Sequence, residues 1–542
     1  MKIPLNHKKI CLISVCSIIF AIINGNFIFP NILKWILKRN VQLRPGSQMR
    51  PLFENIPFPL NFKVFIFNIT NSDDILLGAK PKLNEIGPFV FEEWKFRENI
   101  VDDDKMDTVT YTMKNKFIFR PDLSKGLTGD EIVTVPNLVM FSAINSVKRY
   151  RFEMMPFVTK AMSLIFNEPK SVFLTSSVMD LLFNGIAFNC DANDFAAKAV
   201  CESIKSEGDG QGVRVINETY LSISMLGHKN NTSIGRFTVY RGIKNFKDLG
   251  RILMVNGERI QSVWDGDDCN RYHGTDSTIF PPFLKPDDGL WSFTPDMCMS
   301  LKAHFVRKSS YAGLPTSFYS LDFGDFKNQP DKHCFCQNVP GNGCPPKGTI
   351  DLMPCVASPI YGLTFIELKN DLWDCSIVIL GSKPHFLDAD EELLQNIEGL
   401  MPNRSAHDIF VNFEATTGTP LAAAKRLQFS IEMEPIEEFD WMSKLPNSRL
   451  LPIIWIEESI QLNKTYTNLL KYQLFLPKEI NVVAMWIGIV GGSVILLISG
   501  AFLCMEHFKT ASVRVTQDAD KRSVGNIKRF SGNVTELSID EK

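Results

Sequence analysis

Two long apolar stretches, one near each end of the chain, stand out in its hydrophobic pattern. The first covers residues 10–29 and the second covers residues 480–504. Each is long enough to cross a hydrocarbon core of about 30 Å as an α-helix, and nothing between them is comparably apolar over that length. The pattern predicts a two-pass membrane protein with short tails at 1–9 and 505–542, the second charged and disordered, and one large loop at 30–479.

A cleaved signal peptide is the alternative for the first stretch, because Lys8 and Lys9 precede the apolar run as an n-region would. The run continues to Phe29, however, and Phe29-Pro30-Asn31 lacks the small residues of a cleavage site. We therefore interpret the first stretch as an anchor that is retained.

Both stretches carry small residues at helical spacing. These are Ser17, Ala21 and Gly25 in the first, and the Gly488-Ile489-Val490-Gly491-Gly492 run in the second. Small residues let helices approach closely, so the two anchors are candidates to pair with each other or with a membrane partner. Single small residues without such a role are also common in spanning helices.

Between the anchors, alternation of apolar and polar residues is the commonest local pattern. Residues 426–434 and 108–114 alternate strictly, which buries one face of an antiparallel strand, and 62–69 is nearly continuously apolar. Two regions instead place Met, Leu and Phe at helical spacing, 139–166 and 171–185. We predict an α+β loop, largely antiparallel sheet, with a helical cluster over 139–185.

Composition and modification sites locate the loop. The chain is 45% hydrophobic and 22% charged with a net charge of −2, which is typical of folded domains and, without a basic stripe, argues against a nucleic-acid partner. Nine cysteines and six Asn-X-Ser/Thr sequons fall in the loop, and both features belong to an oxidising compartment. They predict an extracellular loop and cytoplasmic tails. The loop sequons are at Asn68, Asn217, Asn230, Asn231, Asn403 and Asn463, and Asn533 in the tail is interpreted as accidental.

Several motifs in this order resemble the class B scavenger receptor family. They are Phe67-Asn68-Ile69-Thr70-Asn71, Leu83-Asn84-Glu85-Ile86-Gly87-Pro88-Phe89-Val90-Phe91, Gly274-Thr275-Asp276-Ser277-Thr278-Ile279-Phe280-Pro281-Pro282-Phe283 and Gly418-Thr419-Pro420-Leu421 ahead of Lys425-Arg426-Leu427-Gln428. The cysteine block from Cys334-Phe335-Cys336 through Cys344-Pro345-Pro346-Lys347-Gly348 to Cys355 is most similar to the insect sensory neuron membrane proteins. The resemblance covers nearly the whole chain.

The resemblance implies three disulfides, Cys269–Cys334, Cys298–Cys355 and Cys336–Cys344, with Cys190 and Cys201 as a fourth pair. A zinc site at this cluster near His333 is the rival, but zinc ligands usually show paired C-x₂₋₄-C spacing, and only Cys334-Phe335-Cys336 is close to it. We expect the disulfides to be structural.

One stretch departs from the family. Between Tyr361 and Pro384 the family has only a few residues, whereas this chain has about twenty more, 362–381. They include Cys375, which makes the number of loop cysteines odd. We interpret 362–381 as an atypical insertion, either real or the product of a misjudged exon boundary.

The resemblance further implies a β-barrel that encloses a lipid tunnel, with the helical cluster at 139–185 as an apical bundle that receives the ligand. On that basis the expected ligand-binding residues are Met154, Met155, Phe157, Met162, Phe166, Lys160 and Lys170. Flexible thioether side chains adapt to irregular ligands, although an apolar stripe at helical spacing more often forms core. The basic residues are equally compatible with an ordinary solvated face.

The implied function is that of a cell-surface receptor or co-receptor that captures fatty-acid-derived pheromones and passes them through the tunnel to an odorant receptor complex. A soluble odorant-binding protein is a further candidate partner, a homo-oligomer is compatible with the sequence, and no cofactor is expected. A general lipid-uptake receptor uses the same fold and is the alternative.

Two other classes fit less well. A two-pass ectoenzyme shares the topology, but Gly208-Asp209-Gly210-Gln211-Gly212 has no following Lys-Ser/Thr, and neither an H-E-x-x-H nor a G-x-S-x-G motif occurs. A channel would carry functional polar residues in its spanning segments, whereas the second stretch has only Ser493 and Ser499 beyond its edge. We therefore expect neither catalysis nor conduction.

Overall fold

The computed structural model describes residues 7–191, 193–208, 212–336, 343–356 and 379–531. The chain divides into two compact units. The helix unit comprises residues 1–37 and 468–542, and the sheet unit comprises residues 38–467. Each unit is described by itself.

Both apolar stretches form helices. At the N-terminal end, α1 (His7–Ile23) continues through a π-helical turn, η1 (Asn24–Ile28), into α2 (Phe29–Val41). At the C-terminal end, α12 (Lys464–Leu470) and the π-turn η12 (Lys471–Phe475) lead into α13 (Leu476–Ser531). Both are long and apolar enough to cross a membrane. The prediction of a disordered tail is wrong as far as Ser531, because no proline follows Cys504 and a helix that is already formed extends at little cost.

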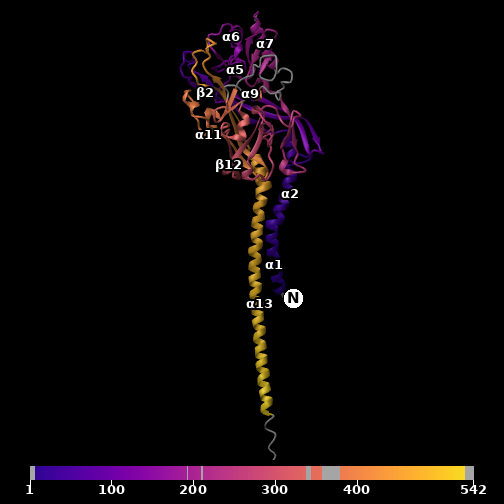
Figure 1. The fold of residues 1–542 in the computed structure, drawn as a ribbon. Helices are drawn as coiled ribbons and strands as arrows, with labels where there is room; N and C mark the ends of the chain where they lie inside the picture. Colours follow the sequence, from indigo (N-terminus) through magenta and orange to yellow (C-terminus); the bar gives the residue numbers. More distant parts are fainter. Residues whose placement is uncertain (1–6, 192, 209–211, 337–342, 357–378, 532–542) are drawn as a thin grey trace, which may run out of the picture. The chain divides into compact units, whose positions relative to one another are not determined.

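Helices α1 and α13 lie side by side in the helix unit (Figure 1). A Cβ built on Gly488 would lie 2.7 Å from Ala21 Cβ, and one on Gly492 would lie 2.6 Å from Ile18 Cγ1. The expectation that small residues let the anchors pair is thus confirmed for both glycines. Ser17 is the exception, because it is exposed and Ser14 takes the buried position on α1.

A large antiparallel sheet forms the frame of the sheet unit. Its 13 strands include a continuous path in the order β10-β9-β3-β2-β1-β18-β17-β16-β13-β12-β11, with β15 joining β17 and β14 joining β15. Their bounds are β1 (Leu60–Ile69), β2 (Leu83–Asp103), β3 (Thr108–Phe119), β9 (Ser233–Tyr240), β10 (Ile252–Val255), β11 (Leu290–Thr294), β12 (Met299–Tyr311), β13 (Leu314–Leu321), β14 (Thr349–Asp351), β15 (Ile379–Ser382), β16 (Ile409–Glu414), β17 (Thr419–Met433) and β18 (Arg449–Gln461). The strands expected at 62–69, 108–114 and 426–434 are confirmed as β1, β3 and β17.

The Gly274-Thr275 dipeptide brings the two edge strands of this sheet together. The Ile252 amide of β10 donates to Gly274 O at 3.0 Å, and the Phe293 amide of β11 donates to Thr275 O at 2.8 Å. Gly274 has φ +81°, and a Cβ there would lie 2.0 Å from Trp291 O, so only glycine fits. The sheet therefore nearly closes into a barrel, and the Gly274-Thr275-Asp276 motif is what closes it.

Asp276 fastens this closure through a buried ion pair. Its Oδ2 lies 2.7 Å from Arg97 Nη2 and accepts from the Tyr111 hydroxyl at 2.8 Å. Burial by itself would raise the pKa of Asp276, but the guanidinium of Arg97 beside it lowers that pKa overall. A charge held inside protein in this way requires its partner.

Three helices, α5 (Leu138–Tyr150), α6 (Met155–Ile165) and α7 (Phe195–Gly208), gather at one end of the sheet unit (Figure 1). The helical prediction over 139–166 is confirmed. Over 171–185 it holds only for 178–184, which end in the π-turn η4 (Asp180–Asn184), because β5 (Phe173–Ser177) pairs with β4 (Ile132–Pro136) before them. The regular spacing of apolar residues there reflects burial in a strand and one turn rather than a helix face. A third sheet contains β6 (Ile186–Asn189), β7 (Val213–Val215) and β8 (Tyr220–Ile223).

These helices lie at the end of the sheet opposite to the one where the chain enters and leaves the unit. Asn145 Nδ2 of α5 donates to Glu432 O near the end of β17, at 3.0 Å. At the other end, Asn61 pairs with Ser459, and the rings of Phe58 and Tyr466 are 5.2 Å apart. The two ends of the barrel are therefore distinct.

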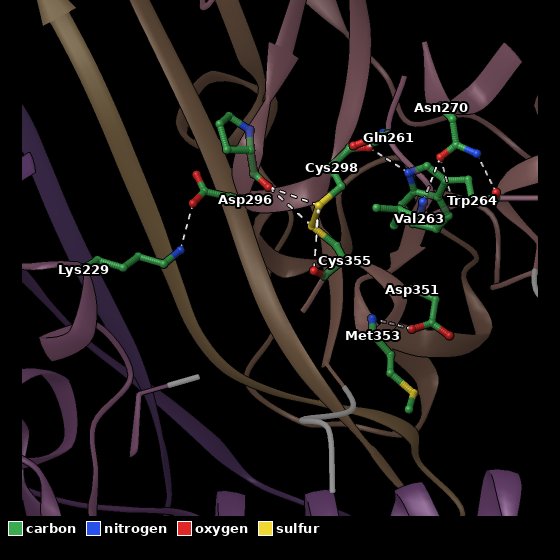
Figure 2. Close-up of a disulfide and its surroundings, with 11 residues drawn as sticks. Lys229, Gln261, Val263, Trp264, Asn270, Asp296, Cys298, Asp351, Met353 and Cys355 are labelled. Atoms are coloured by element: carbon green, nitrogen blue, oxygen red, sulfur yellow. Dashed lines mark hydrogen bonds and ion pairs between the residues drawn. A yellow bond between two sulfur atoms is a disulfide. The ribbon is translucent and has the colours of Figure 1, made fainter. Parts of the chain in front are cut away.

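Four disulfides connect the loops of the sheet unit. They are Cys190–Cys201, Cys269–Cys334, Cys298–Cys355 and Cys336–Cys344, the pairs that the family resemblance implied. Figure 2 shows the Cys298–Cys355 bridge, beside which the Trp264 Nε1–H donates to Cys298 O at 2.7 Å. Of the expected insertion, residues 362–378 with Cys375 lie outside the described residues, whereas 379–381 belong to β15 and are part of the sheet.

Candidate functional site

The inner face of the barrel carries an aromatic group beside the turn η4. In β1 and β2, Phe62 stands directly opposite Phe91, and in β3 Phe119 stands opposite Phe91. Their rings and those of two neighbours form a chain of contacts with centroid distances from 4.8 to 6.4 Å. We call these five residues the aromatic group: Phe62, Phe91, Phe117, Phe119 and Phe183.

Charged residues follow the aromatic group along the same face. Side chains alternate in a strand, so Glu93 and Lys95 lie on the same face of β2 as Phe91, about 7 Å and about 13 Å further along. Glu93 is opposite Phe117, and Lys95 is opposite Asn115. Glu458 of β18 is opposite Phe62 on one side and Lys425 of β17 on the other. Glu93, Lys95, Lys425 and Glu458 thus converge from three strands.

Two more charges complete this set. Asp296, in the turn η8 (Pro295–Met297), lies 2.8 Å from Lys229 Nζ of η5 (Gly227–Lys229) and 3.1 Å from Lys425 Nζ (Figure 2 shows the first pair). Lys95 Nζ lies 2.7 Å from Glu458 and 3.3 Å from Glu93. We call these six residues the inner belt: Glu93, Lys95, Lys229, Asp296, Lys425 and Glu458.

The pKa shifts in the inner belt have clear causes. Burial, followed by the negative charge of Glu458, raises the pKa of Glu93 to about 7. Burial would also raise the pKa of Asp296 and of Glu458, but Lys229 and Lys425 lower it for Asp296, and Lys95 lowers it for Glu458. The inner belt therefore holds two firmly ionised carboxylates and a third, Glu93, that is partly protonated near neutral pH.

A second polar network lies on the outer face of the same strands. Glu457, next to Glu458, accepts from Lys63 Nζ and from Arg426 Nε, both at 2.7 Å. The segment 383–408 covers this face, where Lys383 Nζ lies 2.7 Å from Asp408. We call this set the outer network: Lys63, Glu85, Lys383, His385, Asp388, His407, Asp408, Arg426, Trp455 and Glu457.

The residues expected to bind ligand differ in their burial. Met155 and Met162 are fully buried in the core between helices and sheet, where they pack other side chains. Their helical spacing is explained by this core packing. Met154, Phe157 and Phe166 are half-buried. Sequence reasoning missed the apolar side chains that are exposed around the same helices, Phe152, Leu164 and Phe195.

The basic residues of the helices are mostly engaged in ion pairs. Lys160 pairs with Asp194 at 2.5 Å, and Lys148 pairs with Glu434. Arg149 is buried and bridges Asp351 and Glu432, at 2.6 and 2.7 Å. Lys170 is exposed. Much of the positive charge is thus neutralised and fixes the helices to the sheet.

Comparison with known proteins shows which family the chain belongs to. A model described as the CD36 family matches residues 12–503. The chain belongs to the CD36 family. It is 48% identical over 513 residues to Sensory neuron membrane protein 1 of Anopheles gambiae, which covers 94% of this chain and 90% of that protein. Identity to the proteins of the same name is 48% over 480 residues in Aedes aegypti (88% and 84% covered) and 41% over 493 residues in Ostrinia furnacalis (90% and 89%).

The family and these relatives confirm the resemblance found in the sequence. They support a lipid-binding membrane receptor of the scavenger class with an extracellular domain, rather than an enzyme. The disulfides fit that compartment. His333, Cys336 and Cys344 do bring possible metal-ligand atoms within 4.8 Å of one another, but both sulfurs form a disulfide and are not available as thiolates.

The sequons remain predictions. Asn217, Asn231, Asn403 and Asn463 are exposed. Asn68 and Asn230 are half-buried and accept backbone hydrogen bonds from Thr134 at 2.8 Å and from Phe117 at 3.0 Å. A glycan is accommodated more easily at the first four.

Proposed function

We propose that this chain captures fatty-acid-derived pheromones or odorants at the cell surface and passes them through the barrel to an odorant receptor in a sensory neuron. The observation that carries the proposal is the nearly closed barrel whose inner face bears the aromatic group. Such a face suits an alkyl chain, because each buried CH₂ contributes about 0.8 kcal/mol. The relatives named as sensory neuron membrane proteins support the sensory setting.

The entry point in this proposal is the end of the barrel that carries the helices. Phe195 begins α7 and is 79% exposed, and its ring lies 6.0 Å from that of Phe157. Leu164 on α6 and Phe152 between α5 and α6 are also exposed. Exposed apolar side chains near one another often mark a binding surface. A ligand that leaves this surface would meet the aromatic group next.

The membrane arrangement follows from the two helices of the helix unit. Both tails are cytoplasmic in this proposal, and the sheet unit, with its disulfides and sequons, is outside. The odorant receptor complex is the partner that receives the ligand, and a soluble odorant-binding protein is a candidate donor. Paired anchors leave the outer faces of α1 and α13 to lipid or to another membrane protein.

The test uses exposed side chains, because replacing Met162 with a polar residue would disrupt the core. Phe195→Ser combined with Leu164→Ser should reduce currents evoked by a long-chain acetate in cells that also express an odorant receptor. Leu77→Ser with Met401→Ser is the control, since both residues are exposed elsewhere on the sheet unit. Surface expression is measured for each variant.

Unchanged responses from the first double variant would remove these residues from the capture step. Currents in cells that express this chain alone would instead support a channel. Expression confined to gut or haemocytes would favour the general lipid-uptake function.

A further inference from the structure

The inner belt contains polar atoms that the protein does not satisfy. Glu93 Oε1 accepts from Asn115 Nδ2 at 2.7 Å. The other carboxyl oxygen of Glu93, Oε2, is buried without a hydrogen-bond partner among the described residues, and so is Asn115 Oδ1. Glu93 itself is 2% exposed. Buried polar atoms nearly always have partners, so such atoms require an explanation.

Accessible surface remains at three charged residues of the inner belt. Lys95, Glu458 and Asp296 lie on or against the inner face, and protein surrounds them closely enough that burial is the largest influence on the pKa of each. Their side chains nevertheless keep 14%, 22% and 30% of their accessible surface. A tightly packed interior would leave almost none.

The charge balance of the inner belt defines what it would accept. Burial and the negative charge of Glu458 raise the pKa of Glu93 and so favour its protonated form, in which Oε2 can donate a hydrogen bond. In that state the inner belt has three ammonium groups, from Lys95, Lys229 and Lys425, against the carboxylates of Asp296 and Glu458. It therefore favours an incoming oxygen acceptor over a cation or an unsubstituted hydrocarbon.

We propose that the inner belt is a binding site, inside the barrel, for the oxygen-bearing end of a long-chain ligand, with the alkyl chain lying along the aromatic group. This inference rests on the proposed function. It adds where in the barrel the ligand binds and which class of ligand is preferred. Phe91 and Glu93 are two residues apart on one face of β2, so the apolar and polar parts of the site are contiguous, about 7 Å apart. The ligand class is a fatty-acid derivative that ends in a carbonyl or carboxylate oxygen.

The experiment measures competition on purified full-length protein in nanodiscs. A fluorescent fatty-acid analogue is displaced by hexadecyl acetate, hexadecanoate or hexadecane, which share an alkyl chain and differ in terminal oxygen. The wild-type protein should bind the two oxygenated probes about tenfold more tightly than hexadecane, as expected for one hydrogen bond to a polar or charged group. The ester and the carboxylate separate a neutral acceptor from an anion.

Three variants test whether the side chain of Glu93 donates a hydrogen bond to the ligand. Glu93→Met keeps the volume but has no donor, so it should lose most of the preference for hexadecyl acetate. Glu93→Gln keeps a donor and should retain that preference. Glu98→Met lies on the opposite face of β2, where Glu98 is exposed and pairs with Lys114 at 2.8 Å, so it should behave as wild type. If Glu93→Met fails to reach the cell surface, Lys95→Met replaces it and should lose the preference for hexadecanoate.

The outcomes separate this inference from the proposed function. Equal binding of hexadecane and hexadecyl acetate to the wild-type protein would overturn the inner belt as a binding site and leave the barrel as a lipid conduit. Retention of the wild-type preference by Glu93→Met would do the same. Failure of the wild-type protein to bind the fluorescent analogue at all would overturn the proposed function, and the inference with it.

Discussion

Neighbouring residues on two strands of the barrel, β17 and β18, face opposite sides of the sheet and have contrasting environments. Glu457 of β18 faces outward and is bound by two cations, Lys63 and Arg426, each at 2.7 Å. These cations lower its pKa against the effect of burial. Glu458, the next residue, faces inward, where it binds Lys95 and keeps 22% of its side-chain surface. Arg426 and Lys425 on β17 show the same contrast.

The outer network is saturated, whereas the inner belt is not. His385 Nε2 lies 2.6 Å from Glu85, and Trp455 Nε1 donates to the same carboxylate at 2.7 Å. Within the described residues, no buried side-chain oxygen or nitrogen of the outer network lacks a partner. The inner belt leaves Glu93 Oε2 buried and unpaired, while the side chains of Lys95, Glu458 and Asp296 keep part of their accessible surface. The contrast indicates that the outer charges hold segment 383–408 on the sheet, and that the inner charges are available to a ligand.

Arg426→Met should have the largest effect. It removes the ion pair with Glu457 and the hydrogen bond from Nη1 to Asp408 O at 2.6 Å. Breaking one side of a buried ion pair costs about 3–5 kcal/mol, so thermal unfolding should occur at a clearly lower temperature. Lys425→Met on the inner face is the matched control. An equal loss in both variants would contradict the distinction between the two faces.

Part of the pH dependence of stability should come from the outer network. Burial, and then the neighbouring His385 whose ring stacks at 4.3 Å, lower the pKa of His407 from 6.5 to about 4. The unfolded chain therefore binds a proton below pH 6.5 that the folded chain binds only near pH 4. Stability should fall as pH drops from 6.5 to 4, by up to about 3 kcal/mol.

Unfolding measured between pH 4 and 7 checks this prediction. His407→Gln should make the fall across that window shallower, because one titrating group is gone, while His228, whose pKa burial lowers from 6.5 to about 3, still contributes. A curve for His407→Gln parallel to that of the wild type would assign the acid sensitivity to another group.

In the helix unit, two adjacent glycines of α13 also face opposite sides: one faces α1 and the other does not. A Cβ on Gly492 would meet Ile18 at 2.6 Å, whereas nothing lies within 4 Å of one on Gly491. Gly492→Leu should weaken the helix pair by about 1–2 kcal/mol, and Gly491→Leu should not.

Cysteines replacing His7 and Phe502, whose rings lie 5.1 Å apart, report on the pairing through their oxidative cross-linking. The measurement needs a background in which Cys11, Cys16 and Cys504 are replaced by alanine. Cross-linking that is equally fast in Gly491→Leu and Gly492→Leu would show that the glycine face does not hold the helices together.

Glu93→Met should have the smallest effect on stability, within about 1 kcal/mol of wild type. It removes a carboxyl group with one unpaired oxygen, so the relief of an unsatisfied buried group offsets the lost contact with Lys95. Thermal unfolding of this variant and of Arg426→Met can be compared directly. A loss as large as that of Arg426→Met would make the inner belt a structural element.

Local sequence patterns predicted some parts of the molecule well and others poorly. Strict alternation located β3 and β17, because one buried face imposes a period of two. The helical prediction failed over 173–177 because β5 pairs with β4, some forty residues earlier in the sequence, and this tertiary contact is not visible in a local pattern.

The candidate site was harder to find than the fold. The helical spacing of Met155 and Met162 is the same for a core stripe and a ligand mouth, and burial decided for core at both positions. The inner belt does have a sequence signal. Glu93, Lys95 and Arg97 follow Phe89 and Phe91 at every second position of β2, so all five lie on the same face of the strand. That signal cannot be recognised without knowing which face closes into the barrel, and its partner Asp296 comes from a distant turn.

Photo-crosslinking can show whether the barrel interior binds the ligand. A hexadecyl acetate analogue with a diazirine near the ester would be irradiated with the full-length protein, and the labelled residues mapped by mass spectrometry. If the ligand lies inside the barrel, the labels should be on inner-face residues such as Phe91, Glu93 or Phe117. Labels confined to outer-face neighbours such as Glu92 and Trp94, or to the surfaces of α6 and α7, would contradict binding inside the barrel.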